Sequence, residues 1–163
     1  MKRLLIVWHS RTGAARAMAE TAAGAARAEP GIEVVVLAAE AAGPDDLLAA
    51  EGYIFAAPEN LAALSGEMKA FLDRCYYPVL ERLNGRPYAA LIAAGSDGSG
   101  AARQLTRIAT GWRLKPISEP LIVCTHAQTP EAILAPKHLD PLALAPCAEL
   151  GAALAAGLAM GVF

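Results

Sequence analysis

Five short apolar runs occur along the chain, and each has the length of a buried β-strand. They occupy residues 3–8, 32–37, 52–56, 88–93 and 121–125. Most are apolar at consecutive positions rather than at alternate ones, which is what a strand covered on both faces requires. The runs therefore predict strands in the interior of a sheet.

Helical periodicity fills the intervals between these runs. The pattern predicts helices over residues 14–28, 44–50, 68–83 and 101–112. Pro44 suits the first turn of its helix, whereas Pro78 predicts a kink or an end within the third. Strand and helix thus alternate along the chain, which is typical of parallel strands joined by right-handed crossovers.

The alternation predicts one three-layer α/β domain over residues 1–163, a doubly wound parallel sheet of five strands in the order 2-1-3-4-5. Residues 125–146 carry four prolines and no clear period, so we expect an irregular excursion with at most one helical turn, around PEAIL. A final helix over residues 146–160 is apolar on nearly every side. It should pack on the sheet and on a second surface, for which a partner copy in a homo-oligomer is one candidate.

Composition narrows the classes of partner. The 14 Lys and Arg residues nearly balance the 16 Asp and Glu residues, and no basic run that would neutralise a nucleic-acid backbone occurs. Three cysteines without CxxC spacing predict reduced thiols, and the histidine and acidic spacings match no common metal site. The apolar segments at both ends are shorter than the roughly 20 residues that span a bilayer. We therefore expect a cytoplasmic protein that binds no nucleic acid, membrane or metal.

Ligands of doubly wound sheets bind beyond the carboxyl ends of the strands, where the strand order reverses. In the predicted order that point lies between the first and third strands. The loops that converge there are residues 9–15, 57–66 and 95–100.

The first of these loops offers groups that bind an anion. Ser10 and Thr12 carry hydroxyls, Gly13 lets the backbone come close, and the next helix presents unpaired N–H groups at its positive end. These groups suit a phosphate monoester. A simple helix cap by Ser10 or Thr12 explains the same residues equally well. His9, the first residue of this loop, is expected to face solvent or to cap the helix.

The other two loops have similar alternatives. The second, apolar and opened by a proline, could lie flat against an aromatic ring or could merely cap the next helix through Ser65. The third is rich in glycine, so its N–H groups could bind the edge of a heterocycle or it could be a flexible linker.

Together the three loops resemble those of the flavodoxin-like FMN proteins, in particular their NAD(P)H-dependent FMN reductase and quinone reductase relatives. SRTG at residues 10–13 matches the family's hydroxyl-x-Thr-Gly pattern directly after the first strand. PENLAALSGEMKAFLDR at 58–74 is similar to the stretch in which these reductases carry a proline-led flavin loop. The 95–100 loop falls where their third flavin loop lies, and the resemblance covers residues 2–125.

The resemblance implies a flavodoxin-like fold and an FMN site. It places the FMN phosphate among Ser10, Arg11, Thr12, Gly13, Ala14 and Ala15, and the isoalloxazine ring between Pro58, Glu59, Asn60 and Leu61 on one side and Gly95, Ser96, Asp97 and Gly98 on the other. Two departures stand out. Ala15 replaces a second threonine, so one phosphate hydrogen bond is lost or comes from the backbone. Neither ring loop has the Tyr or Trp of electron-carrying flavodoxins, which leaves one ring face open.

These residues predict an FMN-binding oxidoreductase that takes electrons from NAD(P)H and passes them to a quinone or another small-molecule acceptor. Hydride transfer to a flavin needs no acid or base from the protein, so no catalytic side chain is assigned. The sequence leaves two alternatives open. One is a flavodoxin-type electron carrier without substrate turnover, and the other is a degenerate domain that has lost its cofactor.

Overall fold

The sheet of the computed structural model, which describes residues 1–163, runs in the predicted order. Its strands lie as β2-β1-β3-β5, and the two short strands β6 and β7 both pair with β5 beyond it. The bounds are β1 Lys2–Trp8, β2 Ile32–Ala38, β3 Gly52–Asn60, β5 Pro87–Ala94, β6 Lys115–Pro116 and β7 Leu121–Cys124. The predicted fifth strand is β7, the short β6 before it was not predicted, and the doubly wound parallel sheet is confirmed.

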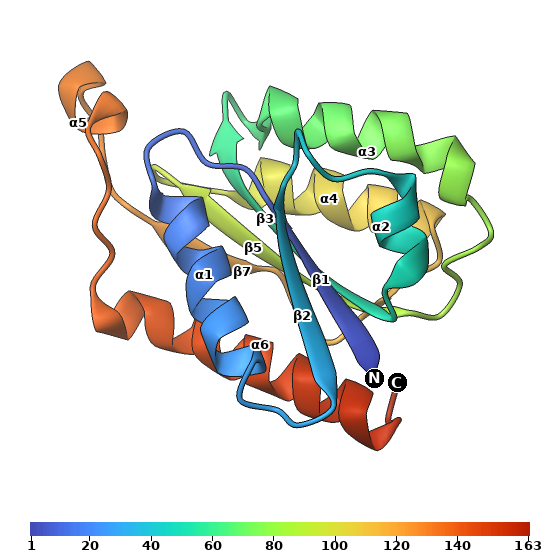
Figure 1. The fold of residues 1–163 in the computed structure, drawn as a ribbon. Helices are drawn as coiled ribbons and strands as arrows, with labels where there is room; N and C mark the ends of the chain where they lie inside the picture. The colour runs from blue at the N-terminus through green and yellow to red at the C-terminus, as the bar shows by residue number, and fades with distance from the viewer.

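Helices cover both faces of this sheet (Figure 1). One face carries α1 (Ala14–Ala26) and α6 (Pro141–Met160), and the other carries α2 (Pro44–Ala49), α3 (Gly66–Val79) and α4 (Ser99–Gly111). In β1, Leu4 and Ile6 point into the core under α1, whereas Leu5 and Val7 point into the core under α3 and α4. Two cores on opposite faces explain why the strands are apolar at consecutive positions.

Alanines dominate α1 because that helix is squeezed between the sheet and α6. Its buried residues are Met18 and six alanines. The backbones of α1 and α6 approach so closely that a Cβ on Gly151 would lie 2.2 Å from the carbonyl oxygen of Ala22. Small side chains at this crossing therefore let α6 hold α1 close against the sheet. Helix α1 begins at the end of the loop of residues 9–15.

The segment after β3 is a hairpin rather than the predicted loop. Strand β3 continues to Asn60, turns at Leu61 and Ala62, and pairs back through β4, Ala63–Leu64. The predicted connection at 57–66 is therefore a β-hairpin. The sequence did not indicate it, because the segment is apolar and has no glycine at the turn.

The last helix also differs from its predicted start at residue 146. It begins at Pro141, where the Asp140 side chain accepts a hydrogen bond from the Ala143 N–H at 2.9 Å, and Pro146 lies inside it. An Asp before a Pro often marks the N-terminus of a helix, so the sequence did indicate this boundary.

At 20 residues and a mean hydropathy of 1.7, α6 is long and apolar enough to cross a membrane, which corrects the expectation that the C-terminal segment is too short. A core helix of a soluble protein passes the same test. One side of α6 packs on α1, while Leu142 and Met160 are exposed. The partner surface expected on this helix stays a prediction.

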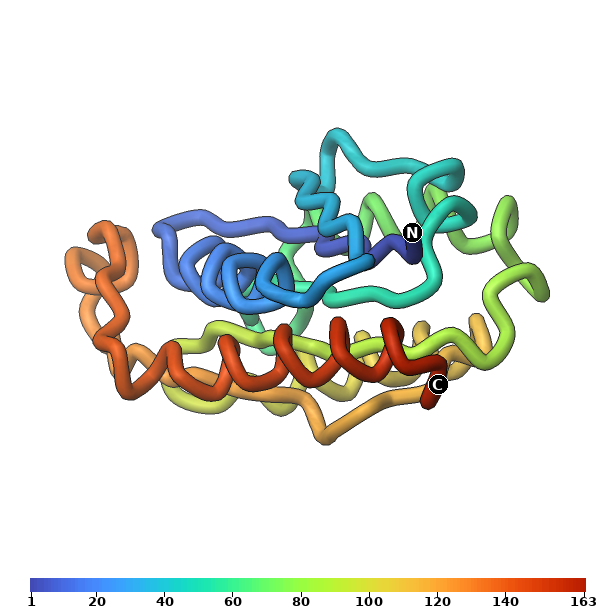
Figure 2. Tube along the Cα trace, turned by 60° about the horizontal axis from the view of Figure 1, so that its bottom comes forward, coloured from blue at the N-terminus to red at the C-terminus, as the bar shows by residue number.

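Residues 125–140, here called the strap, join β7 to α6 and contain the single short helix α5, Pro130–Leu134. The strap stands at one end of the sheet, beside the loop that joins β1 to α1 (Figures 1 and 2). A hydrogen bond of 2.7 Å from the Lys137 N–H to the Thr12 carbonyl joins the two segments. The strap is thereby held against the loop that the sequence marks as an anion site.

Candidate functional site

An open cavity lies at the carboxyl edge of β1, β3 and β5. The space between its walls, counted out to the open mouth and including open solvent, is about 600 Å³. It is lined by the loop after β1, the end of β3, the end of β5 and the strap. The cavity therefore lies at the reversal of strand order, as the fold predicts.

The first wall of the cavity is the phosphate loop, residues 10–15. Gly13 ends its turn with φ +108°, a left-handed conformation that disfavours side chains, and directly precedes α1. Its N–H donates to the Ser10 hydroxyl oxygen at 3.0 Å. Ser10 thus shapes the turn, while its own O–H remains able to donate. The helix-cap alternative is wrong, because the N-cap of α1 is Gly13 and no side chain accepts from the first turn of the helix.

The backbone of the phosphate loop carries a row of unused donors. The N–H groups of Ser10, Thr12, Ala14 and Ala15 donate to no acceptor within the protein. Ala14 and Ala15 are the first residues of α1, so their N–H groups lie at the positive end of its dipole. Their side chains are buried, which leaves the backbone as the binding group. The loop is chemically suited to an anion such as a phosphate monoester.

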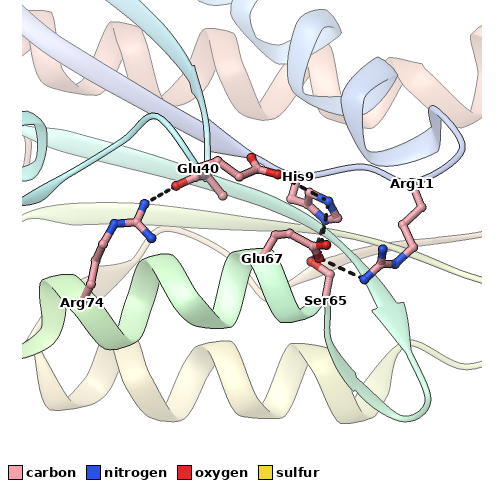
Figure 3. Close-up of polar contacts among 7 residues, drawn as sticks. His9, Arg11, Glu40, Ser65, Glu67 and Arg74 are labelled. Carbon is pink, nitrogen blue, oxygen red and sulfur yellow. Dashed lines mark hydrogen bonds and ion pairs between the residues drawn. The ribbon is translucent and has the colours of Figure 1, made fainter.

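The side chain of Arg11 points away from these donors. Its guanidinium lies 2.9 Å from Glu67 Oε2, and its Nε donates at 2.8 Å to the Asn60 side-chain oxygen in the amide orientation that satisfies both groups. Figure 3 shows the Arg11 and Glu67 pair beside His9. Arg11 therefore bridges the phosphate loop to α3 and the end of β3, with its charge balanced by Glu67.

His9 is buried, contrary to the expectation that it faces solvent or caps the helix. Its Nδ1 lies 2.8 Å from the hydroxyl of the buried Ser65, and its Nε2 lies 3.5 Å from Glu67 and 3.8 Å from Glu40 (Figure 3). The pKa of Glu67 is lowered, first by its own backbone N–H in the first turn of α3 and further by His9 and Arg11. This cluster ties the end of β1 to the start of α3 beneath the phosphate loop.

The second wall is the hairpin, residues 58–64. Leu61 and Ala62 form its tip with φ +51° and +66°, so two residues with side chains adopt a conformation that usually requires Gly or Asn. Such strain costs about 1 kcal/mol or more for each residue. The Leu64 N–H donates to Gln104 on α4 at 2.8 Å, which fixes the hairpin to that helix. Leu61 is held fully exposed at the tip.

Glu59 lines the cavity, but α4 uses its carboxylate. Its two oxygens accept from the N–H groups of Gly98 at 2.9 Å and Ala101 at 3.0 Å, at the N-terminus of α4. A carboxylate at this position satisfies unpaired donors and complements the helix dipole. Glu59 thus locks the hairpin to the third loop rather than offering free acceptors to a ligand.

The third wall is the glycine loop, residues 95–98, and only Gly95 of it lines the cavity. Asp97 accepts from the backbone and the hydroxyl of Ser99, at 3.2 and 2.9 Å, and Gly98 is buried with its N–H on Glu59. Ser96 and Asp97 are exposed. The loop is therefore an ordered helix start and not a flexible linker.

The cavity gathers most, but not all, of the residues that the sequence singled out. Lining residues among them are Ser10, Arg11, Thr12, Ala14, Ala15, Pro58, Glu59, Asn60 and Gly95. Gly13, Leu61, Ser96, Asp97 and Gly98 lie outside the lining.

Other lining residues were missed: Ala93, Ala94, Thr125, Ala127, Ile133, Leu134 and Lys137. The first three stand at the carboxyl ends of β5 and β7, where the strand-edge rule could have found them. The strap residues beyond them carry no such signal.

The thiols of Cys75 and Cys147 take no part in this site. Burial raises the pKa of the Cys75 thiol to about 11 and that of Cys147 to about 11, and neither lines the cavity. The arrangement has no activated sulfur nucleophile there. What the cavity offers is anion binding at one end and a largely apolar slot at the other.

The chain is similar to several known proteins. Residues 41–129, more than half of the chain, match the family described as NADPH-dependent FMN reductase. A curated relative from Acidithiobacillus ferrooxidans, NAD(P)H dehydrogenase (quinone), is 31% identical over 131 residues, which are 68% of this chain and 66% of the relative. A flavodoxin from Aquifex aeolicus is 31% identical over 100 residues, 61% of this chain and 54% of that protein.

The matches to these relatives thus span between about half and two thirds of their length. Among solved structures, oxidised Flavodoxin 1 from Bacillus cereus has a TM-score of 0.76 at 20% identity, covering 94% of this chain and 97% of the other. Likeness at that identity shows the fold, which is flavodoxin-like.

Proposed function

The chain belongs to the NADPH-dependent FMN reductase family, and we propose that it binds FMN in the cavity and acts as an oxidoreductase that passes electrons from NAD(P)H to a small acceptor such as a quinone. When bound, FMN supplies the redox chemistry that amino-acid side chains lack. The protein's own residues hold the cofactor, orient it and control access to it.

The observation that carries the proposal is the row of unused donors in the phosphate loop. Four N–H groups and the hydroxyls of Ser10 and Thr12 have capacity for a phosphate monoester at the positive end of α1. Hydrogen bonds to a charged acceptor contribute about 1.5–3 kcal/mol each, so even two or three give a firm anchor. This arrangement favours FMN binding over the degenerate-domain alternative.

The other end of the cavity fits a flat, largely apolar ring. Pro58 and Ala93 offer apolar surface, and Glu59 is occupied by α4 and so does not place an unpaired charge in the slot. No Tyr or Trp lines the cavity. An uncovered ring face leaves room for a nicotinamide and then for an acceptor, which supports a reductase over an electron carrier.

Binding and turnover test the proposal in two steps. FMN is titrated into the purified protein, and its binding is measured by the change in flavin fluorescence. We expect one binding site per chain. The FMN-loaded protein is then mixed anaerobically with NADPH or with NADH in a stopped-flow instrument. We expect the flavin absorbance to bleach within seconds and to recover when a quinone is added.

Each outcome separates the alternatives. Absence of FMN binding contradicts the proposal and leaves the degenerate domain. FMN binding without reduction by either nicotinamide identifies an electron carrier, in keeping with the similarity to the Aquifex aeolicus flavodoxin. Reduction without reoxidation by a quinone would retain the NAD(P)H step and reject the quinone as acceptor.

A further inference from the structure

We propose that Lys137, in the strap, supplies the positive charge that pairs with the phosphate monoester of the cofactor. This inference rests on the proposed FMN site and adds a binding residue from a segment far from the phosphate loop in sequence. The family match ends at residue 129, before Lys137.

The backbone places Lys137 directly over the phosphate loop. Its N–H donates to the Thr12 carbonyl at 2.7 Å, and its own carbonyl oxygen lies 3.5 Å from where a Cβ of Gly13 would be. Lys137 lines the cavity together with Ser10 and Thr12. The main chain therefore fixes the lysine beside the phosphate loop.

The ammonium group of Lys137 has one donor to spare. Two of its three N–H donors bind the carbonyls of Ile133 and Ala135, at 2.9 and 2.6 Å. The third faces the Thr12 hydroxyl at 3.5 Å, the outer limit of a hydrogen bond. An anion held by Thr12 and the loop N–H groups would take this third donor at close range.

Charge balance at the site also favours a cation. Of the two basic residues that line the cavity, Arg11 is paired with Glu67, whereas no carboxylate lies within 4 Å of the Lys137 ammonium. A phosphate monoester carries about 1.5 to 2 negative charges at neutral pH. Lys137 is thus the unbalanced positive charge that the phosphate meets, and it offsets the hydroxyl missing at Ala15.

A purely structural role for Lys137, as a cap on the carbonyls at the end of α5, makes a different prediction. Removing such a cap would loosen Ile133 and Leu134 at the cavity wall and weaken any flavin equally. Removing a phosphate partner weakens FMN but not riboflavin, which has the same ring and no phosphate. The ratio of the two affinities therefore separates the two roles.

The test measures the equilibrium binding of FMN and of riboflavin to the full chain, with flavin fluorescence as the readout. Lys137→Gln removes the charge but keeps donors for the strap carbonyls, and Lys137→Arg keeps the charge. Lys115→Gln is the matched control, because Lys115 is an exposed lysine on β6 next to the opposite end of β5.

For Lys137→Gln we expect a rise of about 10-fold or more in the FMN dissociation constant, the usual size for a charged hydrogen bond. The riboflavin constant should stay within about 2-fold, because riboflavin has no charged group to accept such a bond. Lys137→Arg should restore most of the FMN affinity, and Lys115→Gln should match the parent.

An equal change for both flavins, or none for FMN, overturns the role of Lys137 and leaves the proposed function standing. A parent protein that binds neither flavin overturns both proposals.

Discussion

The two ends of the cavity treat their polar groups in opposite ways. At the phosphate loop, four N–H groups have no acceptor within the protein, and Lys137 adds a positive charge with no carboxylate beside it. At the hairpin and glycine loop, Glu59 and Asp97 already accept hydrogen bonds from the start of α4 and the loop before it. The first end is built to bind through hydrogen bonds and charge, and the second to hold its own shape. Under the proposed function, we expect the phosphate loop to supply most of the affinity for FMN and the hairpin to control access to its ring.

The largest expected effect comes from placing a negative charge in the phosphate loop. Gly13→Asp puts a carboxylate beside the anion site and should weaken FMN binding by about 100-fold or more, because like charges at close range repel strongly in a partly desolvated site. Gly13→Asn is the matched control, since it brings a side chain of the same shape to the same positive φ without the charge. Equal losses in the two variants would show that backbone strain, and not charge, governs this end.

The next effect belongs to the hairpin side. Glu59→Ala leaves the Gly98 and Ala101 N–H groups without acceptors, so the free energy of unfolding should fall by about 1–2 kcal/mol. FMN affinity should change less than in Gly13→Asp. Urea unfolding monitored by circular dichroism measures the first quantity, with the exposed Glu149→Ala as control. A large loss of affinity without a loss of stability would mean that Glu59 binds the ligand directly.

Strain at the hairpin tip gives an effect of opposite sign. Leu61→Gly replaces a residue held at φ +51° by one that adopts this conformation freely, so we expect a gain of up to about 1 kcal/mol in stability. FMN affinity should change little, because Leu61 lies outside the lining of the cavity. Thermal unfolding with and without FMN measures both, and a loss of stability would show that the turn is unstrained.

The smallest expected effect is acid sensitivity at the phosphate loop. The pKa of Glu67 is lower in the folded chain than in the unfolded one, so its contribution to stability is complete above the unfolded pKa and is lost as pH falls through the folded one. Stability should therefore decline modestly from about pH 5 to about pH 3, and Glu67→Gln should show a flatter profile over that window. Parallel profiles for parent and variant would exclude Glu67 as a source of the decline.

The sequence predicted the sheet and the position of the phosphate loop at the cavity, because both depend on local patterns. Consecutive apolar residues mark strands covered on both faces, and a hydroxyl and glycine turn before a helix marks an anion site. The hairpin was harder to predict, since Leu61 and Ala62 occupy turn positions where Gly or Asn is usually found.

The place of Lys137 could not be read from the chain at all. Its contact with Thr12 joins residues 125 positions apart, and the irregular strap has no period that would reveal where it returns. His9 was misjudged for a related reason, because its partners Ser65 and Glu67 become neighbours only when β1 and β3 pair.

The most direct measurement compares FMN and riboflavin on the unaltered protein. If the phosphate loop and Lys137 hold the cofactor, FMN should bind about 100-fold more tightly than riboflavin, as expected for two or more hydrogen bonds to a charged group. The advantage should shrink as ionic strength rises. Equal dissociation constants for the two flavins would contradict the account, because affinity would then come from the ring and not from the phosphate.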